Sequence, residues 1–339
     1  MYSLFFIKKR AFFLQMTTLR SIKKCEENQV IQLWKCAFEP KADGYFERYF
    51  SNLASPDYKE GDCLGAWIDD NILASVVYIR RMILKSTNDK RMYLCGVISN
   101  VSTLNEYRNM GLSRELLKRS IEKMKDENFD FSILGTGRSG HYSPLGWKTV
   151  PIQTEYLIEN DDDCLISSDD EDIIWTPASS FTSYEKLFEI YQSNPRSYEL
   201  SRCHASIFEH WLGWHWKQNS SYIGLLSNNQ GYIIISQPDG KHGHLNICEW
   251  RTNSIENEMK LLSIARQHIF ERFHRKKFII HTIPQFTDFD ELKWKYKSSE
   301  QNEDVMFRNI QLAENVFDDI QTSFQHSHCR STIWPEEYF

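Results

Sequence analysis

The sequence has no apolar run close to the ~20 residues that a membrane-spanning helix requires. Its eight cysteines include no C-x-x-C pair and follow no secretory signal, so we expect free thiols in a reducing compartment. A formal net charge of -6 leaves no basic excess to neutralise phosphates. These absences predict a soluble, cytoplasmic protein with no membrane and no nucleic-acid partner.

The length suggests two domains, because 339 residues exceed what one core commonly organises, at roughly 150 residues per domain. An acidic run with seven carboxylates in thirteen residues, NDDDCLISSDDED, is typical of a solvated linker. We therefore expect a disordered extension over 1–15, a first domain over 16–159, a linker over 160–174 and a second domain over 175–339. The extension is basic and free of acidic residues, which makes a mitochondrial location the alternative to the cytoplasm.

The stretch from Val97 to Trp147 reads as strand, glycine loop, helix, strand and a further loop. Its centre is EYRNMGLS, residues 106–113, followed by a helix with an apolar face. A helix entered through a glycine leaves several backbone N–H groups unpaired and pointing one way, an arrangement that binds phosphate groups. Gly111 would let such a ligand approach the backbone closely.

The motif Arg108-x-x-Gly111-x-Ser113 resembles the Arg/Gln-x-x-Gly-x-Gly/Ala loop of the GNAT superfamily of N-acetyltransferases, with Ser113 in place of the usual Gly or Ala. The resemblance implies acetyl-CoA as co-substrate, with its pyrophosphate on the backbone amides of this loop. It also implies an α/β fold, a mixed central sheet flanked by helices, over about residues 17–158. The expected acetyl-CoA-binding residues are Val101, Ser102, Arg108, Asn109, Met110, Gly111, Leu112 and Ser113.

The second half repeats the order hairpin, strand, helix, strand, which predicts a second GNAT-like domain. Before its helix, however, lies RTNSIEN, residues 251–257, which contains no glycine. We therefore expect that domain to lack a pyrophosphate loop, to support the first domain and to shape the pocket.

Acetyl transfer from a thioester to an amine requires a neutral amine and a proton for the leaving thiolate. Tyr142, in the loop SGHYSPLGW, lies where GNAT enzymes place a tyrosine beside the CoA sulfur. A phenol is protonated at neutral pH and can supply that proton. The alternative is a tyrosine that only packs under the loop.

The segment HYSPLGW also resembles the YxxFGY segment of the enhanced-intracellular-survival (Eis) type of acetyltransferase, with Gly146-Trp147 on its Gly-Tyr. In that group a second GNAT-like domain follows the first, and the terminal carboxylate returns to the active site as general base. The resemblance makes the α-carboxylate of Phe339 the candidate base, and a frayed or merely docked tail is the alternative. The two-part layout and the aromatic, acidic ending also resemble the fungal lysine N6-acetyltransferases.

Three further groups carry weaker signals. Glu155 is a second candidate for the base or simply a surface carboxylate, and the helical HWLGWHW, residues 210–216, either lines a pocket or packs between domains. His326, His328 and Cys329 have no partners at zinc-binding spacing, so we expect no metal.

Together these features predict an acetyl-CoA-dependent N-acetyltransferase that acts on a primary amine of a small molecule, with a lysine-like acceptor favoured. A protein or peptide acetyltransferase is the first alternative and would need an open groove for its substrate. A non-catalytic acetyl-CoA-binding regulator is the second, and it would bind acetyl-CoA without turnover.

Overall fold

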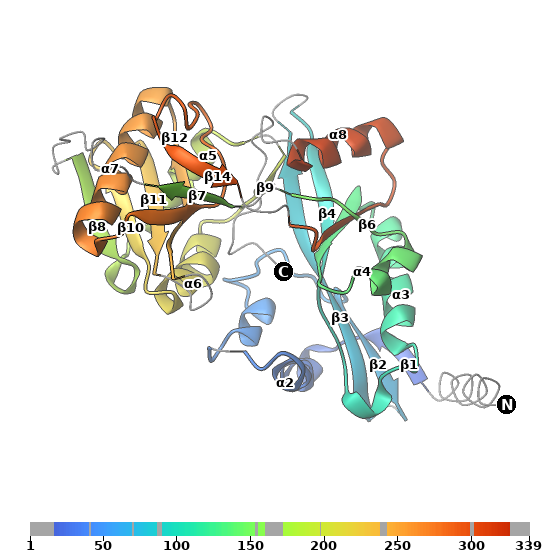
Figure 1. Ribbon diagram of the computed structural model, residues 1–339. Coiled ribbons are helices and arrows are strands. Elements are labelled where there is room, and N and C mark those ends of the chain that lie inside the picture. Colours follow the sequence, from blue (N-terminus) through green and yellow to red (C-terminus); the bar gives the residue numbers. More distant parts are fainter. Residues whose placement is uncertain are drawn as a thin grey trace.

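A computed structural model describes residues 17–325, except 41, 70, 87–89, 153–154, 160–171, 197, 238–242 and 299–301. Two mixed sheets with flanking helices form the molecule, which confirms the predicted α/β class (Figure 1). The expected extension over 1–15, most of the acidic linker and the tail with Phe339 lie outside the described residues. No helix in the described part of the chain is long and apolar enough to cross a bilayer.

The first sheet is built mainly from the N-terminal half. β4 and β5 run parallel, while the other neighbours in the sheet are antiparallel. In spatial order its strands are β1 (Thr17–Ser21), β2 (Cys63–Ile68), β3 (Ile72–Lys85), β4 (Met92–Thr103), β5 (Phe131–Gly135), β15 (Val305–Asn309) and β6 (Lys148–Thr149), and the short β9 (Glu199–Ser201) pairs with the end of β3.

Helices cover both faces of this sheet, because alternate residues of its strands point to opposite sides. On one face, α3 (Leu112–Asp126) packs its predicted apolar side against the residues of β3 that include Val77 and Ile79. On the other face lie α2 (Glu27–Phe38) and the short 3-10 helix η2 (Phe46–Phe50), packed against Tyr78. The middle of the first sheet therefore has helices packed on both of its faces.

The second sheet repeats part of the first. The long helix α7 (Ile255–Phe273) joins two parallel strands, β12 (Leu245–Thr252) and β13 (Lys277–Ile280), just as α3 joins β4 and β5. This confirms the repeated order that the sequence predicts. Its strands, in spatial order, are β14 (Lys295–Ser298), β7 (Tyr156–Glu159), β13 (Lys277–Ile280), β12 (Leu245–Thr252), β11 (Gly231–Ser236), β10 (Tyr222–Leu226) and β8 (Ile173–Pro177).

The two halves exchange a strand. β7, from the N-terminal half, lies between β13 and β14, whereas β15, from the C-terminal half, lies between β5 and β6. From the sequence, residues 148–158 are predicted to form one final strand of the first domain; this prediction is wrong, because they divide between β6 in the first sheet and β7 in the second. Both exchanged strands are short and have mostly apolar residues. A short apolar run in the sequence does not determine which sheet the strand joins. The expected first domain thus contributes β7 to the second sheet, and the expected second domain contributes β15 and the short β9 to the first.

The C-terminal half continues along the first sheet after β15. The helix α8 (Glu314–Gln325) buries Phe317 and Phe324 against the core around β5 and β15. Figure 1 shows α8, in red, beside the cyan strands of the N-terminal half. The first sheet is consequently completed only when both halves have folded.

An aromatic core joins the two halves. Tyr49 of η2 meets Trp211 edge to face, with ring centroids 5.1 Å apart, and both belong to one buried cluster that contains Trp34 and Tyr232. Trp211 lies on a π-helix (Phe208–Leu212) that continues into α6 (Gly213–Gln218), and α5 (Tyr184–Ser193) packs in the same cluster. The HWLGWHW segment is therefore chiefly packing between the halves.

Candidate active site

The glycine loop has the backbone conformation that its sequence favours. After the 3-10 turn η3 (Asn105–Tyr107), Asn109 and Gly111 have φ angles of 64° and 86°, and α3 begins at Leu112. Asparagine tolerates this left-handed region and glycine occupies it without steric cost. The two residues turn the chain sharply from β4 into the helix axis.

The loop presents backbone donors without acceptors. Within the described residues, no side chain caps α3, and the N–H groups from Asn109 to Ser113 have no hydrogen-bond acceptor. Arg108 braces the loop from outside, where its Nε donates to the Thr103 carbonyl at 3.2 Å. Free N–H groups at the positive end of a 15-residue helix fit a pyrophosphate.

The parallel strands β4 and β5 separate just before this loop. They pair only from Cys95 to Val97, so the rest of β4 has no strand partner on that side among the described residues. A register shift between β3 and β4, with φ of 51° at Asn100, bends β4 where the separation begins. Val101 is half-buried beside the α3 core, and the buried Ser102 hydroxyl has no partner among the described residues. This part of β4 therefore leaves backbone groups without a strand partner beside the glycine loop.

The Tyr142 loop lies against the start of α3. Tyr142 ends the short helix α4 (Ser139–Tyr142), and its neighbour His141 places Nε2 3.4 Å from the Ser113 hydroxyl. The Tyr142 ring meets the Trp147 ring edge to face at 6.2 Å. The structure thus brings the two sequence segments into contact.

Tyr142 is suited to keep its proton. Burial raises the pKa of the phenol above its ordinary value, although hydrogen bonding to Thr136 and the charge of Arg138 act in the opposite direction. A phenol with a raised pKa is fully protonated at neutral pH. It can therefore donate a proton to an anion that forms beside it.

His141 is a site residue that the sequence analysis did not select. Burial, followed by the charges of Arg114 and Arg138, lowers its pKa, so the imidazole is neutral at neutral pH. The sequence feature that could have identified His141 is its position next to Tyr142 in the same loop. Its contact with Ser113 gives the serine, where the family motif has Gly or Ala, a partner across the site.

The exchanged strand supports the Tyr142 loop through Arg308. Arg308 of β15 donates from Nη1 to the Leu145 carbonyl, and its Cζ lies 5.4 Å from the centroid of the Trp147 ring. Gly146, with φ of 93°, passes so close to this guanidinium that a Cβ would clash with it. A residue more than 150 positions later in the chain therefore fixes the turn that carries Tyr142.

Of the other predicted residues, the structure describes only Glu155, and it does not bring Glu155 to this place. Glu155 precedes β7 and so belongs to the second sheet, away from the strand that follows the Tyr142 loop. Phe339, His326, His328 and Cys329 lie outside the described residues. Among the residues described, no group of His, Cys, Asp and Glu side chains is arranged to hold a metal ion.

The equivalent position in the second sheet is filled by the protein itself. Ser254 caps α7 by accepting from the Asn257 N–H, and the buried Glu258 accepts from the backbone N–H groups of residues 285–287 at 2.6–3.1 Å. Trp250 donates to the same carboxylate at 3.1 Å. A carboxylate and a loop occupy the start of α7, which explains physically why no pyrophosphate loop exists there.

Residues 18–150 match the family model described as acetyltransferase (GNAT) domain. A crystal structure of a conserved protein of unknown function from Enterococcus faecalis V583, a probable N-acyltransferase, superposes with a TM-score of 0.68 at 17% identity, over 87% of this chain and 72% of that one. A GCN5-related N-acetyltransferase from Kribbella flavida gives 0.63 at 17%, over 86% and 71%.

Eis1 from Mycobacterium abscessus gives a TM-score of 0.63 at 15% identity, over 87% of this chain and 74% of that one. At such identities the likeness concerns the fold, and it extends over both halves of the chain. No curated protein matches the sequence.

Proposed function

We propose that this chain, whose residues 18–150 match the acetyltransferase (GNAT) domain model, transfers the acetyl group of acetyl-CoA to a primary amine of a small molecule, with a lysine-like acceptor favoured. One observation carries the proposal. The amides of residues 109–113, which have no acceptor among the described residues, and the partly buried, protonated Tyr142 lie on loops that touch through Ser113 and His141.

In the proposed reaction, the neutral amine attacks the thioester carbonyl, so that a C–N bond forms and the C–S bond breaks. The electron pair left on sulfur takes the proton of the Tyr142 hydroxyl. The surplus proton of the new amide nitrogen goes to a base, for which the resemblance to Eis-type enzymes suggests the α-carboxylate of Phe339. A placed acid and a placed base contribute about 10²–10⁴-fold each to the rate.

The covering of the sheet favours a small acceptor over a protein chain. The face of the first sheet opposite α3 is covered by α2 and by the aromatic core shared with the second half. The resemblance in layout to fungal lysine N6-acetyltransferases makes free lysine the first candidate. The cysteines at 25, 36, 63, 95, 203 and 248 are free thiols, which supports the cytoplasm as the location.

The test is thiol release from acetyl-CoA across a panel of amines: free lysine, polyamines, aminoglycosides and a histone-tail peptide. Wild type is compared with Tyr142→Phe and with a chain lacking Phe339. We expect turnover on lysine that both changes reduce severely. A loss confined to Tyr142→Phe would leave the tail as packing, and turnover on the peptide alone would favour a protein acetyltransferase. Saturable acetyl-CoA binding without turnover on any amine would favour the non-catalytic regulator.

A further inference from the structure

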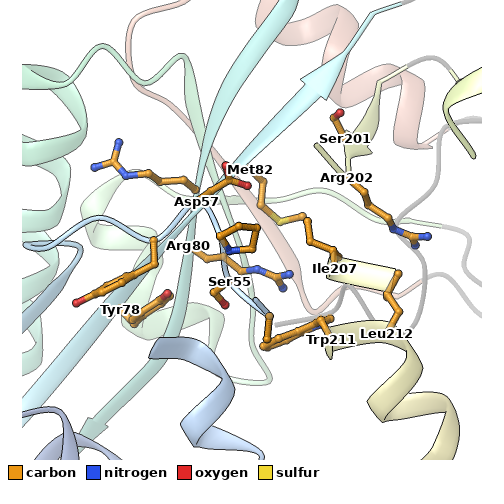
Figure 2. A pocket seen from close by; sticks show the side chains of 14 residues that line it. Ser55, Asp57, Tyr78, Arg80, Met82, Ser201, Arg202, Ile207, Trp211 and Leu212 are labelled. Atoms are coloured by element: carbon orange, nitrogen blue, oxygen red, sulfur yellow. The ribbon is translucent and has the colours of Figure 1, made fainter. Parts of the chain in front are cut away.

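A small pocket lies where the two halves meet, on the face of the first sheet opposite α3. Its walls come from residues 54–58, from β3 between Tyr78 and Met82, and from the segment 201–212 of the C-terminal half. Figure 2 shows these three walls around the Arg80 side chain. Both halves are therefore needed to form the pocket.

Two of the three arginines that line the pocket are neutralised. Arg81 forms a buried ion pair with Asp62 at 2.5 Å and also contacts Glu127. Arg202 holds the buried Glu249 through two bonds of 2.6 and 2.8 Å. Because a buried charge is costly unless it is paired, these carboxylates account for both guanidinium groups.

The third arginine, Arg80, has no such partner. Its guanidinium stacks on Trp211 at 4.4 Å from the ring centroid, and no acceptor among the described residues bonds to it. The single acidic residue of the pocket wall, Asp57, is about two-fifths exposed and lies 3.5 Å from His204. In Figure 2 the Arg80 guanidinium points toward Trp211 and Ile207, inside the pocket.

A guanidinium held flat on an indole keeps its N–H edge available. Arginine binds carboxylates through two parallel N–H···O bonds along such an edge, and it does so most strongly where water is partly excluded. The pocket is therefore built to receive an anionic, planar group. A carboxylate fits this description.

The register of the sheet places Arg80 near the proposed reaction. Arg80 pairs with Val97 on β4, and Val97 pairs with Ile133 on β5 at the last position before these strands separate. Adjacent strands lie about 4.8 Å apart. A ligand bound to Arg80 would thus have its other end close to the gap along β4.

We propose that Arg80 binds the carboxylate of the acetyl acceptor, so that the acceptor class is an amine that also carries a carboxylate, as an amino acid does. This inference rests on the proposed acetyl transfer and narrows its substrate. Only the carboxylate end enters the pocket, while the amine extends toward the gap between β4 and β5. An amine without a carboxylate leaves the Arg80 charge unpaired in the pocket and is selected against.

The experiment compares lysine with cadaverine, which has the same chain and amine but no carboxylate. For wild type, Arg80→Met, Arg80→Lys and the exposed control Arg275→Gln, kcat/KM is measured for both amines at saturating acetyl-CoA. Methionine keeps an apolar side chain on Trp211 but removes the charge. Binding of both amines in the presence of CoA is measured by calorimetry, independently of turnover, and circular dichroism checks folding.

We expect wild type to prefer lysine over cadaverine. A charged hydrogen-bonded pair commonly contributes enough that Arg80→Met should lower the lysine-to-cadaverine ratio of kcat/KM by about 10- to 100-fold, mainly through KM for lysine. Arg80→Lys should recover part of the ratio, and Arg275→Gln should leave it at the wild-type value.

The outcomes separate this inference from the proposed function. A wild type that acetylates amines with no preference for the carboxylate, or an Arg80→Met variant that keeps the wild-type ratio, overturns the inference and leaves acetyl transfer intact. If no amine turns over but lysine binds and Arg80→Met abolishes that binding, the carboxylate site stands and the transferase proposal fails. If calorimetry detects no lysine binding and no amine turns over, both fail.

Discussion

The exchanged strand β15 makes a specific prediction about catalysis through Arg308. Its guanidinium donates to the Leu145 carbonyl and covers Trp147, so it holds both ends of the turn at Gly146. Arg308→Met keeps an apolar side chain over Trp147 and removes the charged hydrogen bond. Such a bond contributes about 1.5–3 kcal/mol.

Arg308→Met should also affect activity, because the turn at Gly146 belongs to the loop that carries Tyr142. A displacement of about 1 Å in a positioned group can cost roughly 100-fold in rate. We therefore expect Arg308→Met to lower kcat by about 10- to 100-fold, while the Kd for acetyl-CoA changes less than about threefold, because the Arg308 side chain lies on residues 145–147, which the loop 109–113 does not include. Steady-state kinetics on the preferred amine and calorimetry with acetyl-CoA give the two values. Arg91→Met, at a half-exposed arginine that pairs with Asp130, is the control.

A double variant tests whether Arg308 acts through Tyr142. If it does, Tyr142→Phe/Arg308→Met should be no slower than Tyr142→Phe alone, since the positioned group is already gone. If the losses in kcat from the two substitutions multiply, Arg308 stabilises the protein as a whole and does not act through Tyr142. A full kcat in Arg308→Met, with only a lower Tm, would refute the positioning role.

Three further predictions follow from single residues. Gly111→Ala places a side chain at φ of 86°, which costs about 1–2 kcal/mol, and should raise KM for acetyl-CoA about tenfold. The control Gly137→Ala, at a glycine with open space around it, should leave this KM unchanged. Equal KM values for the two variants would contradict pyrophosphate binding by the backbone amides of residues 109–113. Because burial raises the pKa of Tyr142, kcat should rise with pH as the amine loses its proton and show no descending limb below about pH 10. A limb near neutral pH would exclude Tyr142 as the acid. Burial, with Arg80 and Arg48, lowers the pKa of His215 to about 4, so the unfolded state binds one more proton between about pH 6.5 and 4. The free energy of unfolding should fall by at most about 1.4 kcal/mol per pH unit on acidification through this window, and urea titrations should show a shallower slope for His215→Gln.

The local parts of the site could be predicted from the sequence. The glycine loop, the apolar face of α3 and the loop that carries Tyr142 each depend on a few consecutive residues whose conformational preferences agree. The contact between the two loops follows from the order strand, helix, strand, because a parallel pair brings its carboxyl ends to one edge.

The long-range parts could not be predicted. β7 and β15 have similar lengths and burial, and only the packing of the whole chain decides that each joins the other half's sheet. Arg308 and Arg80 are ordinary arginines in the sequence. The first becomes important because β15 lies beside Gly146, and the second because nearby carboxylates pair with Arg81 and Arg202 instead.

We propose that the 109–113 loop and Tyr142 form one site for acetyl transfer. A single-turnover experiment tests it directly: protein preloaded with acetyl-CoA is mixed with lysine, and the acetylated product is followed by mass spectrometry for wild type and Tyr142→Phe. We expect transfer by wild type, a rate reduced about 10²- to 10⁴-fold in Tyr142→Phe, and equal acetyl-CoA affinity in both. Transfer at the wild-type rate by Tyr142→Phe would contradict it.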